Sequence, residues 1–410
     1  MKHTVLIYIQ AYNAEHTLRR TLDSVLNQTH TDWIVYLAEN GSTDATGKIA
    51  AEYAAKDYRI VSKQNVVNNF WYFYIFIDEY LRKKLRQYPL FAMLDADDEY
   101  APDFLEKSLA FIEREDLDIV ACGNDFVDAQ TGAVNGSRVL AGNLIIERDG
   151  FSEYFAAYHQ FTRTVWAKVF RLSVLLKCDF SQAKSVMYGA DTMFSMEAFR
   201  NASRVGILAE SLHKYYVSPN SVSYKFDGKR IESDRVLHKT AYDFLISKTG
   251  AVSPRNNEFL LCVYMNALKD TLKVLLNADI TQTEKLNGLQ DMFLCDHARR
   301  LAAYARFGAL LGNASVYTAQ RKELFAGVVN WLLSLEEVPD EKVEDYCELG
   351  EFVSAACENA DDWLFFKKLA VRFLLDQERV REALPKIEEL AELLPDDEEI
   401  FQMRELTNEL

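Results

Sequence analysis

The stretch Leu90-Phe91-Ala92-Met93-Leu94-Asp95-Ala96-Asp97-Asp98 joins an apolar run directly to three carboxylates. A short apolar run bounded by a polar turn is typical of a strand that is buried on both faces. The acidic residues would then follow the carboxyl end of that strand. Because ligands of open α/β sheets bind outside the carboxyl ends of the strands, this stretch predicts both a fold class and the position of a site.

The segments around this stretch alternate between strand-like and helix-like patterns. Apolar runs rich in β-formers predict strands at Val5–Ile9, Trp33–Leu37, Arg59–Val61 and Ile119–Cys122. Apolar residues at helical spacing predict intervening helices over 14–26, 44–53 and 103–112. The alternation predicts an α/β domain of Rossmann-like type, with a mostly parallel sheet and helices on both of its faces.

Polar clusters lie just past three of the expected strand ends. They are Tyr12-Asn13, Glu39-Asn40-Gly41-Ser42 and Asp95-Ala96-Asp97-Asp98. Since parallel strands bring their carboxyl ends to one edge of a sheet, the clusters are expected to line one crevice. The turn at 40–42 is also favourable without any ligand, and Ser42 or Thr43 is expected to cap the next helix.

The pattern changes after about Lys229, where strand signals fade. Helices are expected over roughly 255–277, 281–311, 316–336, 341–358, 361–376, 378–394 and 397–409. The sequence therefore predicts one domain at 1–228 and an all-α C-terminal domain at 229–410. The last hairpin resembles a tetratricopeptide unit, and an irregular helical bundle explains the same pattern at least as well.

Composition and charge exclude some classes of partner. Hydrophobic residues make up 49% of the chain and charged residues 26%, as in ordinary soluble globular proteins. The net charge of -16 argues against a nucleic-acid partner, because phosphate binding needs a basic surface. It also argues against broad adhesion to anionic lipid and leaves peripheral contact of a local patch with a membrane open.

Cysteine spacing and the N-terminal sequence bear on the compartment. The cysteines are Cys122, Cys178, Cys262, Cys295, Cys347 and Cys357. They form no CxxC pair and no zinc-type cluster with histidine, so free thiols in a reducing compartment are expected. The apolar run at 5–9 is too short for a signal peptide or a membrane span. We therefore expect a cytoplasmic protein, with peripheral contact at the inner face of the membrane as its only membrane association.

The acidic cluster after residue 94 is suited to binding a ligand that carries a diphosphate. Mg2+ and Mn2+ neutralise phosphate charge and accept carboxylate oxygens while leaving open positions for phosphate oxygens. Asp95 and Asp97, two residues apart where a strand gives way to a turn, can be shared between a metal and a ribose. Acidic turns after strands are also common without a metal, so this motif alone leaves a structural role open.

Several motifs in a fixed order extend this interpretation. They are Ala11-Tyr12-Asn13-Ala14-Glu15, Ser24-Val25-Leu26-Asn27-Gln28-Thr29, Asn40-Gly41-Ser42-Thr43-Asp44 and Leu94-Asp95-Ala96-Asp97-Asp98. They continue in Val165-Trp166-Ala167-Lys168-Val169-Phe170, in Tyr188-Gly189-Ala190-Asp191-Thr192-Met193-Phe194 and from Tyr215 to Ser223. As a set they resemble the inverting family-2 glycosyltransferases of GT-A fold, bacterial type, over about residues 1–225.

The resemblance implies a function. It implies transfer of a sugar from a nucleotide-diphosphate sugar, most readily a UDP-sugar, to a hydroxyl of a glycan, glycolipid or glycoprotein. Such an enzyme is of the hexosyl- or N-acetylhexosaminyltransferase type (EC 2.4 class), as in polysaccharide biosynthesis. It needs Mn2+ or Mg2+ and inverts the anomeric centre by single displacement. The helical half is expected to position the acceptor or to form a homo-oligomer.

The resemblance also implies roles for single residues. Nucleotide-sugar binding falls to Gln10, Ala11, Tyr12, Glu39, Asn40, Asp95, Ala96 and Asp97, with Tyr12 stacking on the base. In this DxD motif Asp97, with Asp98 as alternate or helper, would bind the metal, and Asp191 would be the general base. Trp166 and Lys168 would lie on the acceptor or phosphate side.

Four of these residues also have a structural explanation. Tyr12 and Trp166 can be core aromatics, Asp191 can cap the helix that follows it, and Lys168 can be a solvated surface lysine. Those alternatives stay open at the level of sequence.

The chain departs from the family pattern in ways that keep a catalytically silent GT-A-like binding or scaffold protein as the alternative. Asn40 replaces an acid and loses its charge, although its amide can still pair with a base edge. Ala190 replaces the acid that usually precedes Asp191, and Gln10 replaces a proline. The usual nucleotide-contacting stretch is replaced by Val66 to Tyr88. Substitute phosphate contacts in that segment are Arg82, Lys83, Lys84 and Arg86.

Overall fold

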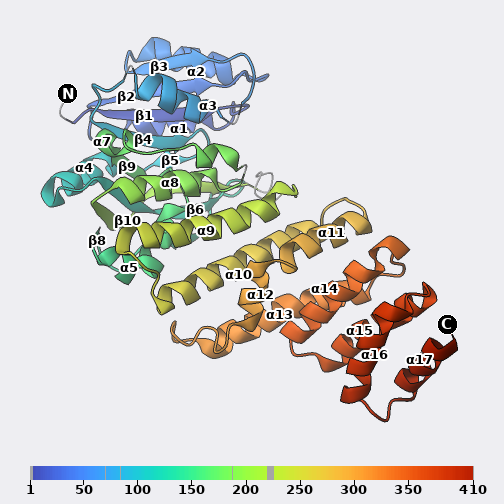
Figure 1. Ribbon diagram of the computed structural model, residues 1–410. Coiled ribbons are helices and arrows are strands. Elements are labelled where there is room, and N and C mark those ends of the chain that lie inside the picture. Colours follow the sequence, from blue (N-terminus) through green and yellow to red (C-terminus); the bar gives the residue numbers. More distant parts are fainter. Residues whose placement is uncertain (1–2, 70, 84, 187, 219–225, 410) are drawn as a thin grey trace. The chain divides into compact units, whose positions relative to one another are not determined.

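The chain forms two compact units (Figure 1), which a computed structural model describes over residues 3–69, 71–83, 85–186, 188–218 and 226–409. The α/β unit comprises Met1–Lys225 and Val236–Asn256, and the helical unit comprises Phe226–Arg235 and Asn257–Leu410. Helix α9 (Lys229–Thr249) contributes residues to both units. The domain boundary after residue 228 stays a prediction.

Four parallel strands form one half of the sheet, and all four were predicted. They lie in the order β3 (Ile60–Gln64), β2 (Trp33–Glu39), β1 (Val5–Ala11) and β4 (Leu90–Asp95). Apolar residues at every position of β1 and β4 except Gln10 and Asp95 suit strands covered on both faces. This half of the sheet confirms the α/β class predicted from the sequence.

The other half of the sheet is mixed. Strand β9 (Lys168–Arg171) lies antiparallel between β4 and β6 (Ile119–Asp128), and β10 (Arg204–Val217) runs parallel to β6. Short antiparallel strands complete it: β5 (Glu99–Tyr100), β7 (Val134–Arg138) and β8 (Leu144–Glu147). The sheet is therefore mixed beyond β4, with parallel pairing dominant only in its first half.

Helices cover both faces of the parallel half (Figure 1), as predicted. Helices α1 (Leu18–Leu26), α2 (Thr46–Lys56) and α4 (Phe104–Glu115) share one core with the β1 side chains Val5, Ile7 and Ile9. On the opposite face Tyr8 packs against Phe73 of α3 (Tyr72–Ile75) and Phe76 of η1 (Phe76–Leu81), with ring centroids 5.2 and 4.4 Å apart. The aromatic segment after residue 70 is therefore core.

Shorter elements connect the strands of the second half. They are α5 (Gly150–Glu153), α6 (Phe155–Tyr158), η2 (His159–Thr162), α7 (Leu172–Leu175) and η3 (Gln182–Ser185), followed by the longer α8 (Ala190–Asn201). Helix α8 packs on the same face as α3, with Phe194 5.2 Å from Phe73 between ring centroids. This packing joins the segment after residue 70 to the helix that carries Asp191.

The helical unit follows most of the predicted periodicities. Its helices are α10 (Pro254–Leu276), α11 (Gln282–Phe293), α12 (Asp296–Ala303), α13 (Ala314–Leu333), η5 (Asp340–Lys342), α14 (Val343–Ala356), α15 (Ala360–Asp376), α16 (Val380–Leu393) and α17 (Glu398–Glu409). One helix predicted over 281–311 is wrong, because the chain breaks after Phe293 and again after Ala303. Arg306, Gly308 and Gly312 then take positive φ values, which a helix excludes.

The last three helices form a small core of their own. Val371 and Leu374 of α15, Ile387 of α16, and Ile400 and Met403 of α17 are buried together. The predicted hairpin at 361–394 is thus present as α15 and α16. Its kinship with tetratricopeptide units stays a prediction.

Two further sequence expectations have structural counterparts. All six cysteines are free thiols; Cys295 and Cys357 are partly exposed and the others are buried. Within the described residues, no helix combines the length and apolar character needed to cross a membrane.

Two glycines of the helical unit test its packing. A Cβ at Gly350 of α14 would lie 2.3 Å from the Phe366 ring, whereas one at Gly327 of α13 would have no neighbour within 4 Å. Gly350→Ala should destabilise the unit by about 1–3 kcal/mol through overpacking. Gly327→Ala should be neutral or stabilising by up to about 1 kcal/mol. Urea denaturation measures both, and equal midpoints for the two variants would contradict the close contact of α14 with α15.

Candidate active site

The three predicted polar clusters meet at one edge of the sheet. In the parallel register Ala11 lies opposite Glu39, and Gln10 lies opposite Asp95. The first two strand ends are also joined by the Asn40 backbone amide, which donates to the Ala11 carbonyl at 2.8 Å. The structure therefore brings together Gln10, Ala11, Glu39, Asn40 and Asp95, as the sequence predicted.

The loops after β1 and β2 are fastened to each other by side chains. The Asn13 amide donates to Ser42 Oγ at 3.0 Å, and Asn13 Oδ1 accepts from the Thr43 amide at 2.9 Å. The Glu15 amide donates to Asp44 Oδ2 at 3.1 Å. The prediction that Ser42 or Thr43 caps α2 is wrong, since the residue before α2 is Ala45 and makes no side-chain cap. Both side chains hold the neighbouring loop instead.

Tyr12 lies in this fastened loop and is 44% exposed. Its neighbour Asn13 takes a left-handed backbone conformation, with φ of 48°, which asparagine tolerates better than most residues. Tyr12 is therefore no core aromatic. Its ring is available for stacking at the edge where the strands end.

Glu39 and Asn40 are buried rather than open to the edge. Glu39 Oε1 accepts from the Ser42 amide at 2.6 Å, so one oxygen stabilises the turn after β2. Asn65, which the sequence did not single out, donates from Nδ2 to Asn40 Oδ1 at 2.8 Å. In the described structure Glu39 Oε2 and Asn40 Nδ2 have no hydrogen-bond partner. Each residue thus keeps one polar atom that a ligand can satisfy.

The acidic loop after β4 is anchored from beneath by α1. Thr17 Oγ1 donates to the Ala96 carbonyl and Thr21 Oγ1 to the Asp98 carbonyl, both at 2.9 Å. Ala96 is buried, Asp95 is partly exposed and Asp97 is exposed. The loop therefore presents Asp95 and Asp97 outward and holds Asp98 inward.

Asp98 faces β10 and not the solvent. Its Oδ1 accepts from the Tyr216 amide at 2.9 Å, and its Oδ2 lies 3.4 Å from His213 Nε2. Burial, followed by the charges of Asp95 and Asp97, raises the pKa of Asp98 well above its ordinary value. These contacts argue against the predicted metal-ligand role for Asp98 and make it the tie between the acidic loop and β10.

Asp191 approaches the acidic loop from the start of α8. Gly189 precedes this helix with φ of 81°, and Tyr74 Oη donates to the Ala190 carbonyl at 3.2 Å. Asp191 is the second residue of the helix, so it is not the N-cap that the structural alternative required. Its side chain reaches solvent, while surrounding protein raises the pKa of Asp191 to about 6, and the Lys168 ammonium opposes that rise.

Asp97 and Asp191 both lie close enough to Asp95 for their charges to act on it. Burial raises the pKa of Asp95 well above its ordinary value, and the charges of Asp97 and Asp191 raise it further. A divalent cation would relieve this repulsion, so the donor set fits Mn2+ or Mg2+ with oxygen ligands. No group of three or more His, Cys, Asp or Glu side chains in the described chain forms a complete metal cage. A bound ion would therefore take further ligands from substrate phosphates and water.

Trp166 and Lys168 are buried, unlike side chains that line a surface. Lys168 Nζ donates to the carbonyls of Thr164 and Trp166 at 2.6 and 3.2 Å. Trp166 stacks with His213 and Tyr215, with ring centroids 4.5 and 5.3 Å apart. Lys168 is no solvated surface lysine: burial, followed by the charge of Arg138, lowers the pKa of Lys168 to about 7. The acceptor-side role of both residues stays a prediction.

The basic residues of the segment 66–88 are engaged within the protein. Arg82 donates to the carbonyls of Leu176 and Cys178, Lys83 pairs with Glu79, and Arg86 donates to the Arg82 carbonyl. Lys84 lies outside the described residues, as does the end of the family resemblance at 219–223. For Arg82 these bonds indicate a structural brace between η1 and the segment after α7.

Sequence reasoning missed Tyr74 and Asn65. Tyr74 belongs to an aromatic run that reads as core packing, yet its hydroxyl makes one polar contact with α8. Asn65 follows directly on β3, at the same edge as the other clusters, and that position was its only signal. Both contacts depend on tertiary structure, which spacing along the chain does not reveal.

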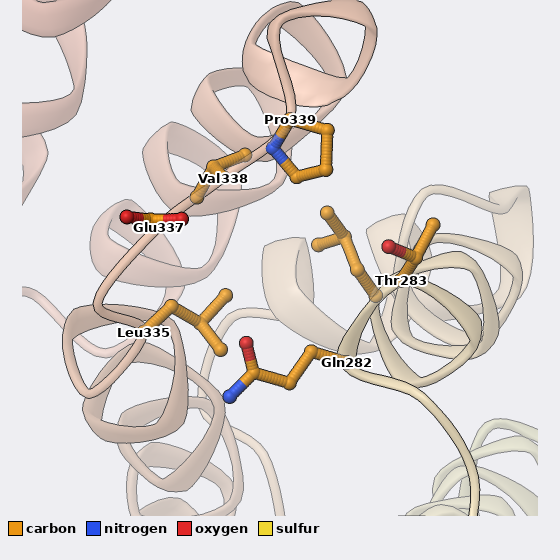
Figure 2. A pocket seen from close by; sticks show the side chains of 7 residues that line it. Gln282, Thr283, Leu335, Glu337, Val338 and Pro339 are labelled. Carbon is orange, nitrogen blue, oxygen red and sulfur yellow. The ribbon is translucent and has the colours of Figure 1, made fainter.

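Two cavities lie away from these carboxylates. A groove of about 950 Å³ runs along the opposite ends of the strands, where its lining includes His3, Pro89 and Arg171. In the helical unit a pocket of about 270 Å³ lies between the first turn of α11 and the segment after α13. Figure 2 shows Gln282 and Thr283 facing Leu335, Val338 and Pro339 across this pocket. Of the site residues predicted from the sequence, Arg86, a substitute phosphate contact, lines the groove, and none lines the pocket of the helical unit.

Comparison with known proteins agrees with this geometry. Residues 6–159 match the family model described as glycosyl transferase family 2. The matched segment of the α/β unit belongs to this family. It runs from β1 to the start of η2 and includes the loops after β1 and β2 and the acidic loop, whereas Asp191 lies beyond it.

Curated relatives of this family-2 unit are similarly distant. EpsJ of Bacillus subtilis (strain 168), described as an uncharacterized glycosyltransferase, is 25% identical over 221 residues. YibD of Escherichia coli (strain K12), described in the same way, is 26% identical over 224 residues. Each alignment covers 53% of this chain and 62% of the relative, so the chain spans less than two thirds of either.

A solved structure found by the comparison is only loosely similar to this chain. Residues 1–349 of S. aureus TarS, in complex with UDP-GlcNAc, are 14% identical with a TM-score of 0.44. That alignment covers 90% of each chain. The family membership of the α/β unit rests on the family model and on the curated relatives.

The fastened loops can be tested through Asn13. Asn13→Ala removes the acceptor for the Thr43 amide. It also places alanine, which has a Cβ but no polar side chain, at a positive φ. Unfolding free energy should fall by about 1–3 kcal/mol. Asn13→Gly relieves the strain and should cost less. Urea denaturation compares them, and an Asn13→Ala variant as stable as the parent would refute the role of this contact.

Proposed function

We propose that the α/β unit is the catalytic domain of an inverting, metal-dependent glycosyltransferase. Its donor is a nucleotide-diphosphate sugar, with a UDP-sugar favoured, and its acceptor is a hydroxyl of a glycan, glycolipid or glycoprotein. The observation that carries the proposal is the meeting of Asp95, Asp97 and Asp191 at the strand ends beside an exposed Tyr12. Membership of glycosyl transferase family 2 supports it.

The donor nucleotide would lie along the ends of β1, β2 and β4. Tyr12 offers an exposed ring for stacking on the base. Asn40 offers one amide group without a partner in the described structure, which suits the polar edge of a base. Asp95 and Asp97 follow on the neighbouring strand and would face the ribose and the diphosphate.

Asp191 would act as the general base. As the acceptor oxygen forms its bond to the anomeric carbon, its proton passes to an Asp191 carboxylate oxygen. The bond from that carbon to the diphosphate oxygen breaks on the opposite face, and the electron pair leaves with the diphosphate. One displacement of this kind inverts the anomeric centre.

A divalent cation held by Asp97, with Asp95 adjacent, would neutralise charge on the departing diphosphate. Asp98 would not ligate this ion; it would keep the acidic loop in place through Tyr216 and His213. A hexosyl or N-acetylhexosaminyl group is the expected transferred group, and bacterial polysaccharide biosynthesis is the expected process.

The helical unit would serve acceptor positioning or homo-oligomerisation. Its described pocket carries a single charged lining residue, Glu337, and no constellation for catalysis. A cytoplasmic location, with peripheral contact at the inner membrane face, stays a prediction.

A catalytically silent binding or scaffold protein is the second candidate. Ala190 leaves Asp191 as the one acid at the start of α8, and Asn40 is buried and bound by Asn65. Nucleotide-sugar binding without turnover would favour this candidate.

Single carboxylate variants separate the two candidates. Wild type is screened against UDP-, GDP-, CMP- and dTDP-sugars, with and without Mn2+, by thermal shift and by donor hydrolysis. Asp97→Ala should abolish the Mn2+-dependent stabilisation by donor, because binding to the folded state is lost. Asp191→Asn should keep that stabilisation and lower turnover by roughly 10²–10⁴-fold. Asp98→Asn should mainly lower the melting temperature. Turnover that survives Asp191→Asn would refute the assignment of the base.

The pH profile tests the environment of Asp191. A base must be ionised, so kcat/KM should fall as pH drops through about 6, the pKa of Asp191. Since the Lys168 charge lowers that pKa, Lys168→Met should move the acid limb to higher pH, and Lys168→Arg should restore it. The exposed Lys56→Met serves as the control and should leave the limb in place. If the acid limb of Lys168→Met coincided with that of wild type, the proposed effect of the Lys168 charge on the pKa of Asp191 would be refuted.

A further inference from the structure

Two arginines of the α/β unit lie close together without an acidic partner. Among the described residues, neither Arg138 at the end of β7 nor Arg163 before β9 forms a salt bridge with a carboxylate. Most other described arginines of this acidic chain do, including Arg171 and Arg200. With a net charge of -16, the chain has an excess of carboxylates to pair them. Uncompensated cations at one place therefore need a different explanation.

Arg138 is held in a fixed position by neutral neighbours. Its guanidinium carbon lies 5.3 Å from the Phe126 ring centroid and 5.9 Å from that of Trp166. Nη1 donates to the Gln160 carbonyl at 3.2 Å. The aromatic rings and the single carbonyl orient the guanidinium and leave most of its five N–H donors without a described protein acceptor.

Arg163 is joined to the helix that carries the proposed base. Its carbonyl accepts from Thr192 Oγ1 at 3.2 Å, and Thr192 follows Asp191 on α8. Its side chain is exposed. The charge of Arg163 acts on Arg138: burial, followed by this charge, lowers the pKa of Arg138 to about 10. The Arg138 guanidinium also bonds the Gln160 carbonyl in the turn that leads into Arg163, so the two side chains belong to the same part of the unit.

The position of this pair distinguishes it from the donor side. Tyr12, Asn40, Asp95 and Asp97 belong to the loops after β1, β2 and β4. The arginines belong to β7 and to the segment before β9, on the β6 half of the sheet. In a single displacement the acceptor hydroxyl must approach the anomeric carbon from the face opposite the diphosphate, and Arg163 is joined to α8, which carries Asp191, rather than to the loops after β1 and β2.

We infer that Arg138 and Arg163 bind an anionic group, a carboxylate or a phosphate, on the acceptor. The inference rests on the proposed function and names its acceptor class: an anionic glycan such as a uronate-containing or phosphate-containing saccharide. Paired guanidinium groups suit both anions, because each presents planar N–H donors to two oxygens. The aromatic stack of Trp166 and Tyr215 adjoins the pair.

The experiment measures binding of small anions to the full chain loaded with UDP and Mn2+. Ligand-observed NMR titrations use methyl β-D-glucuronide, glycerol 3-phosphate and the neutral methyl β-D-glucoside. Wild type should bind at least one of the anions and prefer it to the glucoside. Arg163→Gln should weaken that binding by about tenfold or more, as expected for loss of a charged hydrogen-bond donor. Arg163 is the primary test because its side chain is exposed, whereas Arg138→Gln also disturbs packing on Trp166.

Control measurements distinguish the source of the anion. Arg114→Gln, which removes an exposed arginine paired with Glu115, should change nothing. UDP affinity should be equal in wild type and Arg163→Gln; a parallel loss would assign the arginines to the diphosphate and overturn the inference. A larger loss for UDP-glucuronate than for UDP-glucose would assign them to the donor sugar, with the same consequence. No preference of wild type for either anion over the glucoside would also overturn it.

Failure of the proposed function shows itself separately. Absent donor hydrolysis by wild type would refute glycosyl transfer, while the anion titrations would still report on Arg138 and Arg163. Intact donor hydrolysis with no anion binding would refute only the acceptor class.

Discussion

A cluster of three partly desolvated carboxylates is the constraint around which the α/β unit is built. Burial raises the pKa of Asp95, Asp97 and Asp191, the charges of Asp97 and Asp191 raise that of Asp95 further, and none of the three is neutralised by a direct salt bridge in the described structure. Such an arrangement costs folding free energy whenever the groups are ionised. It persists because each acid is fixed by backbone that the rest of the unit holds in place. A bound cation would offset the negative charge of these carboxylates. It would in turn attract a diphosphate, which the carboxylates alone would repel.

The supports of these carboxylates come from segments that are far apart in the sequence. Thr17 and Thr21 hold the acidic loop from α1, and Asp98 ties the same loop to β10 through the Tyr216 amide. Tyr74 reaches from the aromatic segment to the start of α8, where Asp191 lies. Buried hydrogen bonds of this kind stabilise only modestly one by one, but a missing partner leaves a desolvated polar group. The geometry of the site therefore depends on the whole α/β unit being folded.

The sequence predicted the parts of the fold that depend on local pattern. Strands β1, β2 and β4 are continuous apolar runs ending in polar turns, and periodicity found most helices of the C-terminal half. It failed where tertiary contacts decide: Ser42 bonds across to Asn13 instead of capping α2, and positive φ values break the helix expected over 281–311. Helix α9 was missed because its apolar residues face several directions. In the site, Asp98 and Asp97 look alike in sequence, and only burial separates the structural acid from the exposed one.

The departures from the family pattern have physical consequences that agree with a working site. Without an acid at Ala190, the pKa of Asp191 is set by burial, which raises it, and by the Lys168 charge, which lowers it. A second carboxylate at position 190 would raise it further, so its absence keeps Asp191 ionised nearer to neutral pH. Asp191 also sits in the first turn of α8, where the helix dipole favours the ionised form. The aromatic segment at 71–81 stands where the family pattern has another stretch, and through Tyr74 it supports the helix that carries Asp191, the proposed base. Core packing in this segment thus contributes to a rigid frame for Asp191.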